Sequence, residues 1–100
     1  IFVCVVPGDA EVDLKKAARA SGNKKADLVP VKELLPLTGY VRGGCSPIGM
    51  KRRYPTFIDA GAGRRERIYI SAGVRGVQIV IAPADLMAFA EAVPADLIIE

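Results

Sequence analysis

The chain has 100 residues, of which 51% are hydrophobic and 25% are charged, a balance typical of one soluble globular domain. It contains no histidine. This excludes a Ser-His-Asp or Cys-His catalytic arrangement within the chain and disfavours a zinc site on its two cysteines, so we expect neither metal nor cofactor. No apolar run approaches the ~20 residues of a transmembrane helix, so we expect no membrane partner. Two cysteines make no disulfide framework, which favours the cytoplasm.

The chain opens with a strand followed by a helix. Residues 1–6 are an apolar, strand-like run, and the Pro-Gly pair at residues 7–8 predicts a turn. Asp13 is a good N-cap for a helix over residues 14–20, and Gly22 suits a left-handed C-cap. Natural chains rarely begin at the first residue of a buried strand. We therefore expect residues 1–100 to be a single domain whose amino-terminal portion lies upstream.

The middle of the chain is irregular. Residues 25–29 predict an extended piece, and residues 31–35 predict a helical turn that Pro36 ends, because proline restricts the residue before it. Residues 37–51 then contain four glycines and one proline, with no period of 2 or 3.6. Such a stretch is either a disordered insert or a functional loop. Its apolar side chains argue against disorder, so we expect an ordered, functional loop.

Three short strands are expected in the second half of the chain: residues 54–59, 67–71 and 77–81. A turn over residues 60–65 joins the first two, and a short glycine turn joins the last two into a hairpin. A helix from Ala82 to about Ala92 has Pro83 in its first turn, where proline is tolerated. A final edge strand is expected over residues 95–99. The pattern predicts a mixed α/β domain with an antiparallel component.

The loop segment Gly43-Gly44-Cys45-Ser46-Pro47 has the features of a ligand-binding backbone. Glycines let the backbone approach a ligand closely, and successive N–H groups can stabilise charge on a carbonyl oxygen. Ser46 adds a hydroxyl that both donates and accepts. Cys45 has no histidine to activate it, so a pocket-lining role is favoured over a nucleophilic one. By composition alone, a purely structural turn remains the alternative.

Basic residues gather in four small clusters at the edges of the expected elements: Lys15, Lys16 and Arg19; Lys24 and Lys25; Lys51, Arg52 and Arg53; and Arg64, Arg65 and Arg67. Each cluster alone is typical of solvated surface. The formal net charge of +3 permits an RNA partner without arguing for one. Four clusters together are compatible with a surface that follows phosphates.

Five segments occur in the order found in a known family: Asp-Leu-Lys-Lys at 13–16, Thr-Gly-Tyr and Gly-Gly-Cys-Ser-Pro-Ile-Gly within 38–49, Pro-Thr-Phe-Ile-Asp at 55–59, Ile-Tyr-Ile-Ser-Ala-Gly at 68–73, and Pro-Ala-Asp-Leu at 83–86. They closely resemble the YbaK/EbsC family of aminoacyl-tRNA editing domains. That family includes free-standing deacylases and the editing insertion of bacterial prolyl-tRNA synthetases. The resemblance implies an α/β (α+β) fold with a mixed, largely antiparallel, barrel-like sheet flanked by helices.

The resemblance also implies an activity and a partner. Such proteins hydrolyse the ester that links a wrong amino acid to tRNA, commonly Cys or Ala on tRNA(Pro). The expected partner is the acceptor end of a mischarged tRNA, with prolyl-tRNA synthetase as a second candidate. The same fold acting as a binding module for an aminoacyl or nucleotide end, without turnover, is the alternative function.

The expected substrate contacts lie in the loop and the hairpin: Thr38, Gly39, Gly43, Gly44, Cys45, Ser46, Pro47, Gly49, Ser71, Gly73 and Gln78. The expected tRNA contacts are basic: Lys51, Arg52, Arg53 and Arg75. The family's catalytic lysine lies on a strand upstream of Ile1, so the catalytic residue is unknown. Gln78 departs from the Asp expected in cysteine-specific members. Its strand position suits an outward polar residue equally well, so the amino acid removed stays open.

Overall fold

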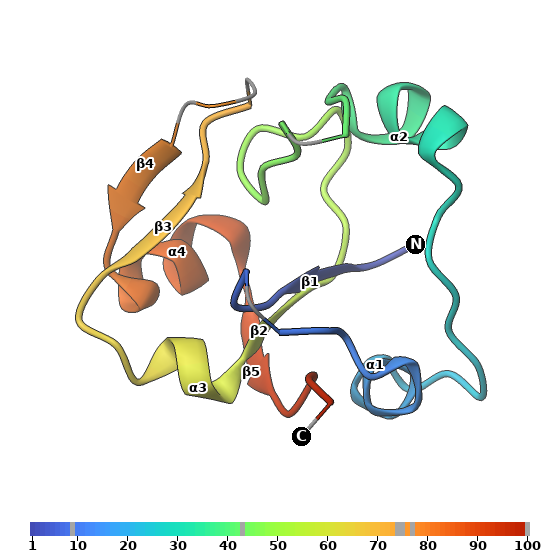
Figure 1. The fold of residues 1–100 in the computed structure, drawn as a ribbon, viewed down its shortest axis with the longest axis horizontal. Coiled ribbons are helices and arrows are strands. Elements are labelled where there is room, and N and C mark those ends of the chain that lie inside the picture. The colour runs from blue at the N-terminus through green and yellow to red at the C-terminus, as the bar shows by residue number, and fades with distance from the viewer. Residues whose placement is uncertain (9, 43, 74–75, 77, 100) are drawn as a thin grey trace.

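The computed structural model describes residues 1–8, 10–42, 44–73, 76 and 78–99. Nine elements follow one another along this part of the chain: β1 (Val3–Val5), α1 (Leu14–Ser21), α2 (Val31–Thr38), β2 (Thr56–Asp59), α3 (Ala60–Gly63), β3 (Ile68–Ser71), β4 (Gln78–Ile81), α4 (Pro83–Ala90) and β5 (Val93–Ala95). The β3–β4 hairpin and α4 lie on one side of β1, and α1 and α2 lie on the other (Figure 1). The mixed α/β class expected from the sequence is confirmed.

The first sheet has three strands in the order β1-β2-β5, and both of its pairings are parallel. Cys4 lies opposite Phe57, and Phe57 lies opposite Val93. Parallel neighbours need long crossover connections, which α1 and α2 provide between β1 and β2, and α4 provides before β5. This sheet is therefore not antiparallel, and the described strand pairings do not support barrel-like closure.

The second sheet is the hairpin expected from the sequence. β3 and β4 pair antiparallel, with Tyr69 opposite Val80 and Ser71 opposite Gln78. Because side chains alternate along a strand, these four residues share one face of the hairpin. The other face carries Ile70, which is 6% exposed and belongs to the core.

The core lies between β2, β3 and α4. Ile58 and Leu86 are fully buried at its centre, and Ile70, Ala90 and Ala92 pack around them. Removing a side chain of this kind from a packed core costs about 2–5 kcal/mol, so these contacts fix the hairpin against the parallel sheet. In the described residues, no helix is long and apolar enough to cross a membrane.

Helix α1 has the ends predicted for it. Oδ1 of Asp13 accepts hydrogen bonds from the backbone N–H of Lys15 (2.9 Å) and of Lys16 (3.2 Å). Gly22 adopts φ 76°, and its N–H reaches the carbonyl oxygens of the last turn. An N-cap of this type contributes about 0.5–2 kcal/mol, which supports a helix of only eight residues.

Helix α2 continues through Pro36, so the expectation that this proline ends it is wrong. Proline removes one N–H donor from the helix. Further along, Oγ1 of Thr38 donates to the carbonyl oxygen of Leu34 (2.7 Å), and Gly39 N–H donates to that of Leu35 (2.9 Å). Gly39 then ends the helix with φ 84°.

Two other boundaries differ from expectation. Residues 60–65 begin with the one-turn helix α3 because the buried carboxylate of Asp59 accepts from Gly61 N–H (3.0 Å), as an N-cap does. The same carboxylate accepts from Leu97 N–H (3.2 Å). The last strand is β5, two residues earlier than expected, because an edge position tolerates Pro94. Beyond β5, Ile98 forms an isolated antiparallel bridge with Val12.

Candidate functional site

The long loop between α2 and β2 starts from a fixed point. Thr38 is 8% exposed, and its hydroxyl accepts from the N–H of Tyr40 (3.0 Å) while donating to the end of α2. The carbonyl oxygen of Thr38 accepts from the N–H of Lys51 (3.0 Å). Both ends of the loop therefore meet at Thr38, which makes this buried residue a support for the loop.

Tyr40 braces the loop from inside. Its hydroxyl donates to the carbonyl oxygen of Ile48 (2.6 Å). Two glycines with positive φ make room for it: Gly49 at 75° and Gly73 at 94°. A Cβ on Gly49 would lie 2.9 Å from the Tyr40 hydroxyl oxygen, and one on Gly73 would lie 2.8 Å from Cε1 of the ring. Since Gly73 follows β3, Tyr40 fixes the loop against the hairpin.

Short hydrogen bonds shape the turn that Tyr40 supports. Gly44 N–H donates to the carbonyl oxygen of Val41 (2.9 Å), and the Cys45 thiol lies 3.5 Å from the same oxygen. Ser46 is 3% exposed, and its Oγ accepts from Ile48 N–H (3.3 Å). The hydroxyl of Ser46 is therefore held inside the loop and is not a freely rotating surface group.

A cavity of about 280 Å³ lies between β1, this loop and β3. We call it the loop cavity. Its lining combines residues of β1, the loop and β3: Val3, Cys4, Val5, Val6, Cys45, Ser46, Pro47, Met50, Tyr69, Ile70 and Ser71. Four residues expected to contact substrate from two distant segments meet here: Cys45, Ser46, Pro47 and Ser71.

The other described residues that were expected to contact substrate do not line the loop cavity. Thr38 and Gly39 support the loop at the end of α2, and Gly49 and Gly73 accommodate Tyr40. Gln78 is exposed opposite Ser71 and does not line the cavity. Gly44 is buried in the loop turn. Gly43 lies outside the described residues.

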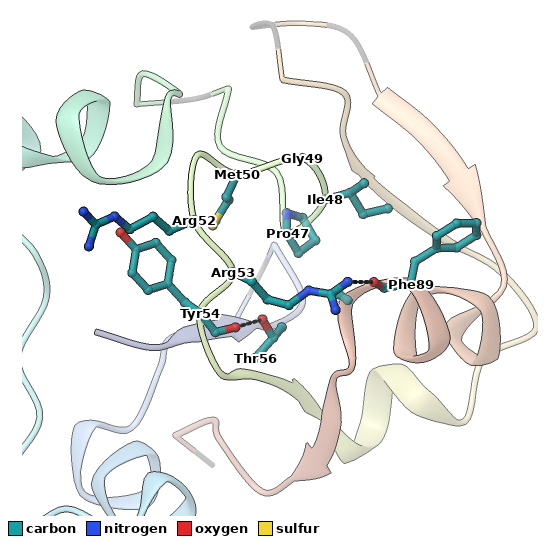
Figure 2. A pocket seen from close by; sticks show the side chains of 10 residues that line it. Pro47, Ile48, Gly49, Met50, Arg52, Arg53, Tyr54, Thr56 and Phe89 are labelled. Carbon is teal, nitrogen blue, oxygen red and sulfur yellow. Dashed lines mark hydrogen bonds between the residues drawn. The ribbon is translucent and has the colours of Figure 1, made fainter.

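A second cavity, of about 320 Å³, lies on the other side of residues 47–50, and we call it the arginine cavity. Figure 2 shows Arg52, Arg53, Tyr54 and Phe89 around it. Arg53 is already engaged: its guanidinium donates to the Glu91 carboxylate (2.9 Å) and to the Phe89 carbonyl oxygen (3.1 Å).

The four residues expected to contact tRNA therefore differ in availability. Lys51 and Arg52 are exposed, and neither forms an ion pair with another described residue. Arg53 is held by Glu91. Arg75 lies outside the described residues.

The lining of the loop cavity restricts its chemistry. It includes hydroxyls of serine and tyrosine, two thiols and backbone groups, but no Lys, Arg, Asp or Glu among the described residues. Partial burial raises the pKa of the Cys4 thiol, which keeps it protonated at neutral pH. No group of three or more Cys, Asp or Glu residues in the described part of the chain is placed to hold a metal ion.

Sequence reasoning did not identify the β1 wall of this cavity or the brace at Tyr40. A strand pattern shows that residues 3–6 are apolar, but not which loop they will face. Tyr40 occurs in the motif that carries the family resemblance, yet its role depends on Gly73, which is distant in sequence. The paired positive-φ glycines become meaningful only once the tyrosine is seen between them.

Comparisons with known proteins show the family to which this fold belongs. Residues 1–89 match the aminoacyl-tRNA editing domain family. EbsC of Enterococcus faecalis, a proposed Cys-tRNA(Pro)/Cys-tRNA(Cys) deacylase, is 52% identical over 85 residues, which are 85% of this chain and 52% of EbsC. The uncharacterized protein YwhH of Bacillus subtilis is 30% identical over 89 residues, or 89% of this chain and 56% of YwhH.

A solved structure of a proposed trans-editing enzyme for prolyl-tRNA synthetase superposes with a TM-score of 0.83 and 28% identity. The match covers 93% of this chain and 59% of that structure. The chain thus spans about half the length of the two relatives in sequence. A family match over residues 1–89, with the same fold in a solved relative, shows that this chain belongs to the aminoacyl-tRNA editing domain family, as its resemblance to YbaK/EbsC proteins predicted.

Proposed function

We propose that the protein hydrolyses the ester of a mischarged aminoacyl-tRNA, with Cys-tRNA(Pro) or Ala-tRNA(Pro) as the substrate. The loop cavity carries this proposal, because Ser46, Pro47 and Ser71 converge on it from two segments of the chain. Its volume of about 280 Å³ suits a small aminoacyl group. EbsC, the relative named for this reaction, supports Cys as the first amino acid to test.

In the proposed reaction, a water molecule attacks the ester carbonyl carbon in the loop cavity. The bond from that carbon to the ribose oxygen breaks, the ribose oxygen takes a proton, and the free amino acid leaves. Negative charge develops on the carbonyl oxygen and needs hydrogen-bond donors. The backbone N–H groups of Cys45 and Ser46 donate to no other described residue, so they are the candidate donors. One such donor is worth about 2.7–4 kcal/mol of transition-state stabilisation.

A second candidate function is binding of an aminoacyl or nucleotide end without turnover. One observation favours it: the described lining of the loop cavity has no carboxylate, lysine or histidine to move a proton. We therefore assign no residue of the lining as catalytic.

We also propose that the partner is the acceptor end of tRNA and that the protein acts alongside prolyl-tRNA synthetase. The solved trans-editing relative supports this proposal.

The test is deacylation by the full-length protein. Cys-, Ala- and Ser-charged tRNA(Pro) are incubated with the protein, and correctly charged Pro-tRNA(Pro) serves as the control substrate. The proposal expects faster release of at least Cys or Ala than in buffer, with Pro spared. Inertness toward all three mischarged substrates, together with binding of the charged tRNA, would favour the binding module.

A further inference from the structure

A third cavity, of about 350 Å³, borders the loop cavity along β3. The two cavities share four residues: Val5, Val6, Tyr69 and Ile70. The lining of the third cavity also includes Arg65 and Arg67, from the segment that leads from α3 into β3 (Figure 1). A ligand seated in the loop cavity can therefore extend past Tyr69 toward these two arginines.

Arg65 and Arg67 are available for an anionic partner. Both are exposed, and neither forms a salt bridge or side-chain hydrogen bond with another described residue. Glu66, between them in sequence, is exposed and does not line this cavity. Arg53, on the opposite side of the loop, is instead neutralised by Glu91. The guanidinium groups of Arg65 and Arg67, which form no ion pair with another described residue, therefore lie next to the loop cavity on the β3 side.

Tyr69 lies between this charge and the loop cavity. Its side chain is 68% exposed although it sits within a strand, while its neighbour Ile70 is 6% exposed. Alternation along β3 places Tyr69 on the same face as Ser71, which lines the loop cavity. An exposed aromatic ring beside free arginines is the combination by which proteins hold single-stranded nucleic acid: bases stack on the ring and phosphates meet the cations.

We propose that Arg65, Arg67 and Tyr69 bind the unpaired 3′ end of the RNA that carries the ester, with a base stacked on Tyr69 and backbone phosphates at the arginines. This inference rests on the proposed function, because that function puts the ester in the loop cavity. It assigns the approach of the RNA strand to the β3 side, away from the Arg53–Glu91 pair.

The test measures RNA binding separately from hydrolysis. Full-length protein is titrated with an uncharged acceptor-stem hairpin that has an unpaired 3′ end, and with the same hairpin ending blunt, at several salt concentrations. The Arg65→Ala/Arg67→Ala variant is compared with Lys24→Ala/Lys32→Ala, which loses the same charge at exposed positions that line neither cavity. Tyr69→Ala is compared with Tyr69→Phe, which keeps a ring for stacking.

We expect Arg65→Ala/Arg67→Ala to weaken binding of the unpaired end about tenfold or more and to reduce the salt slope by roughly 1.4, or 0.7 for each phosphate contact on a single strand. Tyr69→Ala should weaken binding by about tenfold, and Tyr69→Phe should bind as the wild type does. The control variant should bind both hairpins with nearly the wild-type affinity. The substitutions at Arg65, Arg67 and Tyr69 should change the affinity for the blunt hairpin little.

Equal binding by Arg65→Ala/Arg67→Ala and its control would overturn the inference, as would an equal loss for both hairpins, which would indicate a duplex contact. Hydrolysis is then measured with the same variants. If Arg65→Ala/Arg67→Ala hydrolyses the charged tRNA at the wild-type rate and with the wild-type KM, this inference is rejected and the proposed function is retained. Binding that depends on the three residues in a protein without hydrolysis supports the RNA contact and rejects the deacylase.

Discussion

The ring of Tyr40 occupies the space that a side chain on Gly73 would need, with only 2.8 Å between Cε1 and a Cβ placed there. This contact joins two segments that are far apart in sequence, the loop after α2 and the turn after β3. Tyr40 also donates to the carbonyl oxygen of Ile48, and the residue before Ile48, Pro47, lines the loop cavity. We therefore expect the shape of the cavity to depend on the contact between Tyr40 and Gly73.

Gly73→Ala is expected to destabilise the protein more than Gly76→Ala does. Both glycines have positive φ, 94° and 78°, but a Cβ on Gly76 meets no atom within 4 Å. The left-handed backbone alone costs about 1–2 kcal/mol in each variant. Collision with Tyr40 adds about 1–3 kcal/mol in Gly73→Ala only. Urea unfolding of the two variants checks this. Equal losses of unfolding free energy would show that the Tyr40 ring moves away from the new Cβ at no cost in free energy.

Tyr40→Phe is expected to lower the unfolding free energy by about 0.5–1.5 kcal/mol, because the Ile48 carbonyl loses its donor. Tyr54→Phe is the matched control, since the Tyr54 hydroxyl donates to the carbonyl oxygen of Leu37 (2.8 Å). Both variants should lose similar stability. Only Tyr40→Phe should slow deacylation, because only Tyr40 holds the loop turn. Equal rates in the two variants would remove the Tyr40 hydrogen bond from the function.

Cys45→Ala is expected to retain most of the deacylation rate. Cys45 lines the loop cavity, but no histidine exists in the chain to activate its thiol. Removal of a true covalent nucleophile lowers a rate by several orders of magnitude. Single-turnover deacylation of Cys-tRNA(Pro) distinguishes the two cases. A collapse of the rate in a folded Cys45→Ala variant would make Cys45 the nucleophile.

Cys4 is expected to make stability fall at alkaline pH. Burial raises the pKa of this thiol in the folded protein above its ordinary value of 9.0. Above that pH the unfolded chain loses the proton first, so the unfolded state gains stability relative to the folded state. The contribution of the Cys4 thiol to the free energy of unfolding is therefore complete below pH 9.0 and is lost as the pH rises through the pKa of the thiol in the folded protein.

The measurement for Cys4 is the unfolding free energy of the wild type and of Cys4→Ala between neutral and alkaline pH. All other titratable groups are common to both proteins, so the difference between the two curves isolates Cys4. The wild type should lose its advantage over Cys4→Ala as the pH rises. Parallel curves would mean that the folded thiol titrates as an exposed one does.

Local signals in the sequence were sufficient for the parts of the fold that local chemistry decides. Asp13 and Gly22 bounded α1 correctly, and two strand-like runs joined by a short glycine turn predicted the β3–β4 hairpin. These features depend on neighbours within a few residues or on one tight connection. The composition of residues 37–51 predicted an ordered loop, and hydrogen bonds at Thr38, Tyr40 and Ser46 give the loop a fixed shape, while its function stays a prediction.

The partners of the strands could not be predicted in this way. An apolar run at residues 3–5 is equally compatible with parallel and antiparallel neighbours, and only the crossovers decide that β1, β2 and β5 run parallel. Helix α2 continues past Pro36, which removes only the N–H that would donate to the carbonyl oxygen of Lys32, and the helix ends where Thr38 and Gly39 bond its last turns. The contact of Tyr40 with Gly73 depends on the packing of the whole chain.

The most direct test of the account is the rate of Cys release from Cys-tRNA(Pro), measured side by side for the wild type, Gly73→Ala and Gly76→Ala under conditions where all three are folded. The account predicts hydrolysis by the wild type well above the spontaneous rate, a similar rate for Gly76→Ala, and a strongly reduced rate for Gly73→Ala. A wild-type rate equal to that in buffer would contradict the activity. Equal rates for Gly73→Ala and Gly76→Ala would contradict the role of Tyr40 in shaping the cavity.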